Sequence, residues 1–255
     1  MLLKYDLVSL ILIFSIHKVF SGHLKRSLTF VIDDTGSMSK HIRQVKLKTQ
    51  EVFDAVINSK SSEIENFVLV TFNDPDVKLR TKTKEVSVFK SKLEDISVDG
   101  GVDCPEMTMK GISLGIDESL PYSLFYVSTD ATAKDMELYE EVMRKALKKF
   151  IQVTFLLTGD CHDRESPNYK IYKDLADVTG GQVFNMNKDE VKTIMDYIIN
   201  TIRDKKVTLY KENFPAKETE GTTKQFPFSA DSKVQTLTLS LVGGQPKIVV
   251  IDSKG

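Results

Sequence analysis

Short apolar segments alternate with amphipathic segments along most of the chain. Nearly continuous apolar runs are typical of strands covered on both faces of a sheet, and they occur at 27–32, 67–72, 123–130, 152–160 and 182–186. Apolar residues recur at helical spacing in segments 41–57, 86–96, 105–119, 135–150, 169–178 and 188–203. A short edge strand is expected at 77–80. This alternation predicts an α/β fold, a doubly wound, Rossmann-like and mostly parallel sheet with helices on both faces.

The pattern changes after residue 205. Two segments rich in β-branched residues, KVTLYKENFP and KVQTLTLSLVGGQPKIVVIDSKG, flank a polar loop, and the second contains a Gly-Gly turn. We therefore predict that residues 27–205 form the α/β domain and that residues 206–255 begin an antiparallel, β-sandwich-like domain. Because this segment holds few strands for a stable sandwich, we expect that domain to be incomplete and the chain to be a fragment or truncated.

Residues 1–21 have the features of a secretory signal peptide. Lys4 supplies a positive charge, an apolar run covers 7–16, and the small residues Val19 and Ser21 suit signal-peptidase cleavage. A buried hydrophobic helix is the alternative interpretation. The run is too short to span a bilayer comfortably, and no later segment has the length of a membrane span. We therefore expect the mature chain to be secreted.

The net charge bears on the choice of partner, and the cysteine content bears on disulfide formation. The 255 residues carry a formal net charge of -1, which gives no reason to expect nucleic acid or an anionic membrane surface as the partner. Cys104 and Cys161 are the two cysteines of the chain. In the oxidising compartment of a secreted protein they are expected to form one disulfide, and two free buried thiols are the alternative.

The segment FVIDDTGSMS places several side-chain oxygens directly after the first predicted strand. In a doubly wound sheet, the binding site lies outside the carboxyl ends of the strands. Asp33, Thr35 and Ser37 are spaced so that an extended turn can aim three oxygens at one point. Asp130 ends a later strand, and Asp103 lies in the loop GGVDCPE. Carboxylates and hydroxyls are hard ligands that suit Mg²⁺ or Mn²⁺.

Two other interpretations of this segment stay open. Asp34, Thr35 and Ser37 are good helix caps, and a helix is predicted to follow. DDTGS also superficially resembles aspartyl-phosphate phosphatases, in which a second Asp follows the nucleophilic Asp two positions later. Here the two acids are adjacent, so the second points away from the first. The sequence has no Walker A, G-x-S-x-G or H-E-x-x-H motif, and His162 has no nucleophile nearby. We therefore predict that the chain is not an enzyme.

The motif D-x-T-G-S-M after a β-strand resembles the metal-ion-dependent adhesion site of von Willebrand factor type A domains. The segments FVIDDTGSM, FVLVTFNDPDV, GGVDCPEM, FYVSTDATAKD and VTFLLTGDCHDR together resemble the A domain at the N-terminus of hemicentins, which are large extracellular-matrix proteins. The resemblance covers roughly residues 27–203, and the strands after Val207 resemble the segment that follows that domain. This combination is much more specific than D-x-T-x-S alone.

The resemblance implies a role for each candidate residue. Asp33, Thr35 and Ser37 correspond to the first-loop ligands of Mg²⁺, with Mn²⁺ or Ca²⁺ as alternatives, and Asp130 corresponds to a carboxylate that acts through water. Asp103 takes the second-loop role, where many family members have Thr. That departure makes the site more negative, which weakens the capture of an acidic partner or shifts the preference toward Ca²⁺.

The resemblance also implies a function. We expect a secreted, cation-binding adhesion module of the extracellular matrix or cell surface, in which an acidic side chain of a protein ligand completes the metal sphere. The alternative is a structural matrix module in which the metal only stiffens the loops. Dependence of partner binding on the metal separates these two expectations.

Overall fold

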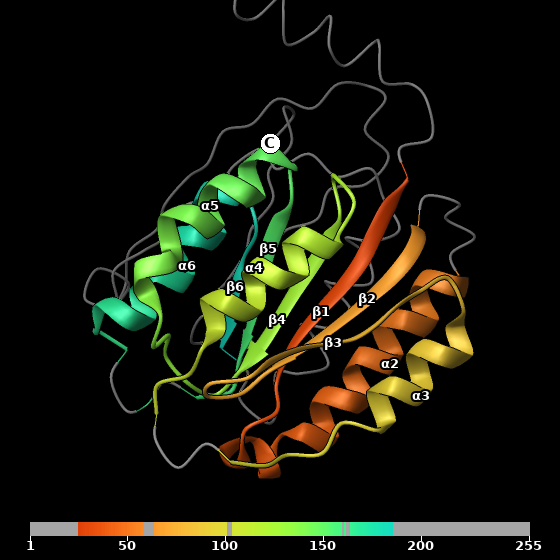
Figure 1. Ribbon diagram of the computed structural model, residues 1–255, viewed down its shortest axis with the longest axis horizontal. Helices are drawn as coiled ribbons and strands as arrows, with labels where there is room; N and C mark the ends of the chain where they lie inside the picture. The colour runs from red at the N-terminus through yellow and green to blue at the C-terminus, as the bar shows by residue number, and fades with distance from the viewer. Residues whose placement is uncertain (1–24, 59–63, 101–103, 160, 162–163, 186–255) are drawn as a thin grey trace, which may run out of the picture. The chain divides into compact units, whose positions relative to one another are not determined.

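The computed structural model describes residues 25–58, 64–100, 104–159, 161 and 164–185 (Figure 1). The predicted signal peptide at 1–21, Asp103, the helix at 188–203 and the β-domain at 206–255 lie outside the described residues. The chain divides into two compact units, Met1–Asp204 and Lys205–Gly255, and the described residues all belong to the first. The boundaries of the predicted domains stay predictions.

Six strands form one sheet in the order β3-β2-β1-β4-β5-β6. Their bounds are Arg26–Asp33 (β1), Ile64–Phe72 (β2), Val77–Thr83 (β3), Leu124–Thr129 (β4), Gln152–Leu157 (β5) and Val183–Asn185 (β6). Neighbouring strands are parallel except β2 and β3, which makes β3 an antiparallel edge strand. The mostly parallel sheet and the edge strand expected at 77–80 are therefore confirmed.

Helices cover both faces of this sheet (Figure 1). One face carries α2 (Ile42–Asn58) and α3 (Val86–Glu94), and the other carries α4 (Thr108–Glu118), α5 (Tyr139–Lys148) and α6 (Pro167–Thr179). Successive strand residues point to opposite faces, so Phe30 joins the first core and Val31 the second. This arrangement confirms the doubly wound prediction. Within the described part of the chain, no helix has the length and apolar character needed to cross a membrane.

Helix α4 begins at Thr108, so the prediction that it begins at Pro105 is wrong. The chain before it forms a short parallel bridge instead. The Glu106 N–H donates to the carbonyl oxygen of Thr132 at 2.9 Å, and the Glu106 carbonyl accepts the N–H of Lys134 at 2.7 Å. The Glu106 carbonyl also accepts the N–H of Thr108 at 2.8 Å. The chain at Glu106 is therefore held as a bridge to a distant segment, and the helix begins two residues later.

Asp135 also has a different role from the predicted one, the start of a helix. Its carboxylate accepts the N–H groups of Met109 at 3.0 Å and Lys110 at 2.7 Å, which caps the N-terminus of α4. Burial of this carboxyl raises its pKa. A short 3₁₀ turn, η2 (Met136–Leu138), follows before α5 begins. The capping carboxylate thus comes from a distant loop and not from the sequence just before α4.

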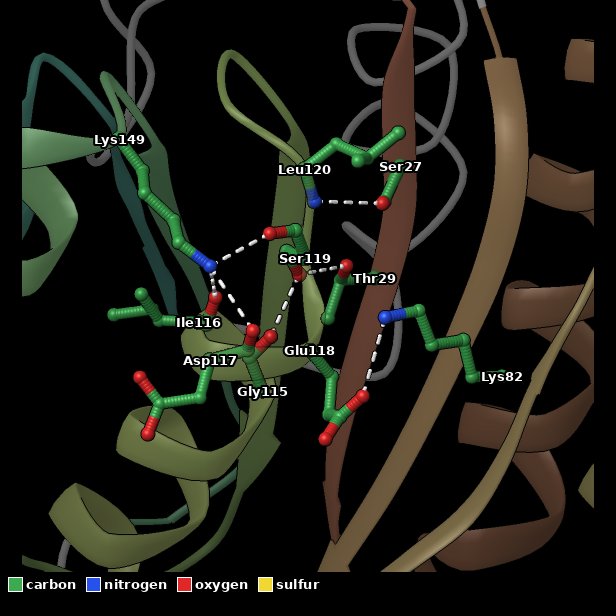
Figure 2. A network of polar contacts seen from close by, with 10 residues as sticks. All are labelled: Ser27, Thr29, Lys82, Gly115, Ile116, Asp117, Glu118, Ser119, Leu120 and Lys149. Carbon is green, nitrogen blue, oxygen red and sulfur yellow. Dashed lines mark hydrogen bonds and ion pairs between the residues drawn. The ribbon is translucent and has the colours of Figure 1, made fainter.

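Lys149 closes the other end of α4, at the amino ends of the strands (Figure 2). Its ammonium group donates to the carbonyl oxygens of Ile116 at 2.7 Å, Asp117 at 3.0 Å and Ser119 at 2.8 Å. The last carbonyl groups of a helix have no partner within the helix itself. One lysine therefore supplies partners for three backbone oxygens at the C-terminus of α4.

Replacing Lys149 with methionine is expected to lower the free energy of unfolding by about 1–2 kcal/mol, since hydrogen bonds that involve a charged group are among the stronger ones. Chemical denaturation followed by circular dichroism measures this change. The neighbouring Lys148 is exposed, so Lys148→Met is the matched control and should change stability by less than about 0.5 kcal/mol. Equal stabilities for the two variants would contradict the capping role.

Candidate metal centre

The candidate residues gather where the strand order reverses. The chain runs from β1 to β2 on one side and then returns to place β4 on the other side of β1. Asp33 is the last residue of β1, and Asp130 directly follows β4. In open α/β sheets, binding sites lie outside the carboxyl ends of the strands at such a reversal. The topology therefore brings these two carboxylates to one place, although 97 positions of the numbering separate them.

Four side chains form one continuous series of hydrogen bonds. The Thr35 hydroxyl donates to Asp33 Oδ1 at 2.6 Å and lies 2.9 Å from the Ser37 hydroxyl oxygen. The Ser37 hydroxyl donates to Asp130 Oδ1 at 2.9 Å. Asp33 and Thr35 are fully buried, whereas Ser37 is exposed and Asp130 is partly exposed. The oxygens thus extend from the sheet interior to the surface.

Helix capping does not account for Thr35. It precedes the 3₁₀ turn η1 (Gly36–Lys40), but its side chain makes no cap hydrogen bond there. Instead, the Thr35 hydroxyl and backbone N–H both donate to Asp33 Oδ1, the N–H at 3.0 Å. Ser37 is bonded to Thr35 and Asp130. These hydroxyls face the strand ends and not the helix that follows.

Asp34 points away from the cluster, as predicted for the second of two adjacent acids. Its carboxylate accepts a hydrogen bond from Arg80 Nη2 at 2.7 Å, and the pair is largely buried. Arg80 also donates from Nε to the Thr71 hydroxyl at 2.8 Å. Asp34 therefore joins β1 to the edge strand β3, while Asp33 alone of the two contributes its carboxylate to the cluster.

The environment of Asp33 disfavours a bare negative charge. Burial raises the pKa of its carboxyl from the ordinary 3.8 to about 6, and the nearby charge of Asp130 acts in the same direction. Hydrogen bonds from Thr129 and Thr35 lower the pKa but do not compensate for burial. A cation bound beside Asp33 would favour its ionised form.

The donor chemistry fits a small, hard divalent cation. Two carboxylates and two hydroxyls supply only oxygen, the ligand type that Mg²⁺, Mn²⁺ and Ca²⁺ prefer. Within the described ranges, no group of three or more His, Cys, Asp or Glu side chains could hold a metal ion. A site here would therefore depend on the hydroxyls of Thr35 and Ser37, and it would leave positions for water or a partner.

The loop before α4 is hydrogen-bonded to the loop that follows β1. The Gly36 N–H donates to the carbonyl oxygen of Gly100 at 2.9 Å, and the Asp99 N–H donates to that of Asp34 at 3.0 Å. Asp103, the predicted second-loop ligand, lies outside the described residues. Its assignment stays a prediction.

The predicted disulfide is present between Cys104 and Cys161. Their Cα atoms are 5.8 Å apart, which is ordinary for a disulfide. The bridge joins the loop before α4 to the loop after β5, and both loops lie at the carboxyl edge of the sheet. The alternative of two free thiols is therefore wrong.

Sequence reasoning missed Thr129, the last residue of β4. Its buried hydroxyl donates to Asp33 Oδ2 at 2.6 Å and accepts the Ala131 N–H at 3.0 Å. Thr129 therefore fixes the second carboxylate oxygen, while Thr35 fixes the first. This contact depends on the register between β1 and β4, in which Ile32 pairs with Ser128 and the next residues of the two strands are neighbours. No local sequence signal gives that register.

Comparison with known proteins shows the family to which most of the chain belongs. Residues 27–188 match the family described as von Willebrand factor A domain. The chain is 36% identical to hemicentin-2 of Mus musculus over 230 residues, which cover 90% of this chain and 4% of that protein. The chain therefore spans only a small part of the length of this relative.

Solved structures share the fold at low sequence identity. The VWA domain of SpRpn10 matches with a TM-score of 0.53 and 14% identity, over 72% of this chain and 100% of that one. Proximal thread matrix protein 1 from the mussel byssus, with a zinc-occupied MIDAS motif, matches with a TM-score of 0.52 and 13% identity, over 69% and 46%. The matched family, the hemicentin relative and the six-stranded sheet together show that this chain belongs to the von Willebrand factor A domain family.

Proposed function

We propose that this chain is a secreted module of the extracellular matrix that binds one divalent cation and uses it to bind a protein partner. The observation that carries the proposal is the hydrogen-bonded series of Asp33, Thr35, Ser37 and Asp130 at the strand ends. Similarity to hemicentin-2 supports the matrix setting. The zinc in the MIDAS motif of the mussel protein supports the capacity of this fold to hold such an ion.

The proposed ligands divide into a buried and an exposed part. Asp33 and Thr35 are buried and oriented by Thr129 and by each other, so they supply a fixed base for the ion. Ser37 and Asp130 reach the surface, where an acidic side chain of a partner can approach. When bound, the cation would supply a positive charge that attracts this carboxylate and offers it a coordination position.

The same arrangement disfavours an enzymatic role. Catalysis of hydrolysis or group transfer needs a nucleophile and a base within hydrogen-bonding reach. Asp33 and Thr35 are fully buried and not accessible to a substrate. The exposed Ser37 hydroxyl donates to Asp130, whose carboxylate we propose as a metal ligand and not as a catalytic base. We therefore propose a binding role and not a phosphatase-like one.

A metal-dependent adhesion module and a metal-stiffened structural module differ in whether binding to the extracellular matrix requires the ion. The full chain, produced by a secreting eukaryotic host, is applied to decellularised extracellular matrix in Mg²⁺ and again in a chelator. We expect retention to fall at least about tenfold on chelation and in Ser37→Ala, because loss even of a group that only orients a metal ligand typically weakens a metal site by 10–100-fold. Added Mg²⁺ should restore retention of the wild type.

The Asp34→Asn variant is the matched control for this experiment, because Asp34 faces Arg80 and not the cluster. It should keep its Mg²⁺-dependent retention. Retention that is equal in Mg²⁺ and in chelator would refute the adhesion proposal. Thermal stabilisation by Mg²⁺ without any effect on retention would instead favour the structural module.

A further inference from the structure

One disulfide joins two loops at the edge of the sheet where the proposed metal centre lies. Cys104 precedes α4 and Cys161 follows β5, at a sequence separation of 57. Neither cysteine belongs to the hydrogen-bonded series of candidate ligands. Residues on both sides of the bridge nevertheless contact the segment that directly follows Asp130.

Both sides of the bridge contact the segment that follows Asp130. The N–H and the hydroxyl of Thr132 lie 3.2 and 3.4 Å from Cys161 Sγ, and both donate to it. The carbonyl of Thr132 accepts the N–H of Glu106, two residues after Cys104, at 2.9 Å. Thr132 is almost fully buried between them. The bridge therefore fastens two loops to a segment that begins at a candidate ligand.

The segment leading into Cys161 also packs against the end of β4. The Thr158 N–H donates to the carbonyl oxygen of Thr129 at 3.0 Å. Gly159 contacts the backbone of Asp130 so closely that a side chain would not fit there. Cys161 itself has a φ of 50°, a left-handed conformation that non-glycine residues adopt uncommonly. The covalent bond thus helps to hold an unfavourable turn beside Asp130.

We propose that the Cys104–Cys161 bridge is a positioning element of the metal centre, so that cation affinity depends on the oxidation state of these two cysteines. This inference rests on the proposed function. With the bridge closed, Asp130 stays within hydrogen-bonding distance of Ser37. With the bridge open, ion binding must also order the loops around Asp130, and that loss of conformational entropy weakens the affinity.

The bridge is open to chemical reduction, because Cys104 is exposed and Cys161 is partly exposed. A water-soluble phosphine gives two electrons to the disulfide. The S–S bond breaks, two thiols form, and the phosphine becomes a phosphine oxide with its oxygen and both thiol protons supplied by water. An oxidant such as glutathione disulfide reverses the change at the protein by taking up two electrons and two protons.

The test is titration calorimetry of Mg²⁺ into the full chain in three states: oxidised, reduced by the phosphine, and carrying Cys104→Ser with Cys161→Ser. We expect the reduced and serine forms to bind at least about tenfold more weakly, the range found when partners that orient metal ligands are lost. Reoxidation of the reduced form should restore the affinity. Lys149→Met is the matched control, because it weakens the opposite end of α4 and should leave affinity unchanged.

The outcomes distinguish failure of the positioning role from failure of the proposed metal centre. Equal affinity of folded oxidised, reduced and serine forms would overturn the positioning role but leave the metal centre intact. No binding by the oxidised wild type would overturn the metal centre and this inference with it. If circular dichroism shows that the serine form is unfolded, Thr132→Val keeps the bridge but removes one donor to Cys161. A severalfold loss of affinity in that variant supports the inference, and an unchanged affinity contradicts it.

Discussion

Asp33→Asn is expected to abolish cation binding and leave the fold intact. The change removes the charge of the carboxylate that lies deepest in the cluster, where Thr35 and Thr129 donate to its two oxygens. Asparagine has nearly the same shape but can offer one oxygen and no charge. We expect Mg²⁺ affinity to fall more than about 100-fold, beyond the range typical for residues that only orient a ligand.

Thermal unfolding with increasing Mg²⁺ measures this loss, because an ion that binds only the folded state raises the melting temperature. The melting temperature of the wild type should rise with Mg²⁺ concentration, and that of Asp33→Asn should not. Asp34→Asn makes the same chemical change one residue later, where the carboxylate pairs with Arg80. It should respond to Mg²⁺ like the wild type. If both asparagine variants respond equally, Asp33 is not a ligand.

The metal-free domain is expected to lose stability as the pH rises from about 4 to about 7. Burial raises the pKa of Asp33 to about 6, whereas the unfolded chain has the ordinary value of 3.8. The folded state therefore binds more protons between these values, and its stabilisation is complete below pH 3.8 and lost as the pH passes 6. Each pKa unit corresponds to about 1.4 kcal/mol, so the expected loss from this residue is about 3 kcal/mol.

Urea denaturation of the metal-free full chain at several pH values measures this effect. Burial also raises the pKa of Asp135, so the useful quantity is the difference in pH dependence between wild type and Asp33→Asn. The variant should lack about 3 kcal/mol of the decrease that the wild type shows. Saturating Mg²⁺ should remove most of this pH-dependent loss of stability in the wild type, because a bound cation favours the ionised carboxylate. Parallel pH profiles of the two proteins without metal would contradict the raised pKa.

Local sequence patterns predicted the fold because each apolar run or helical spacing indicates one strand or one helix. The apolar runs that include Phe30 and Val31 belong to strands covered on both faces, and the sheet places these two residues in different cores. The start of α4 could not be predicted in this way. Glu106 bonds to Thr132 and Lys134, and Asp135 supplies the cap, so these contacts depend on a loop about 26 residues later.

The candidate site likewise contains residues that local sequence predicts and residues that depend on long-range contacts. Asp33, Thr35 and Ser37 could be predicted because their spacing and position after a strand are local properties. Asp130 followed from the rule that parallel strands end at one edge of the sheet. Thr129 and Arg80 could not be predicted, since their contacts depend on the register between β1 and β4 and on the place of β3 beside β2.

One cation is expected to bind at Asp33, and titration calorimetry of Mg²⁺, Mn²⁺ and Ca²⁺ into the full chain tests this most directly. We predict one ion per chain, with about half a proton released per ion at pH 6 and almost none at pH 8, because Asp33 is half protonated near its pKa of about 6. Titrations in two buffers with different heats of ionisation give the proton count. Absence of binding for all three ions, or binding with the same proton release at both pH values, would contradict cation binding at Asp33.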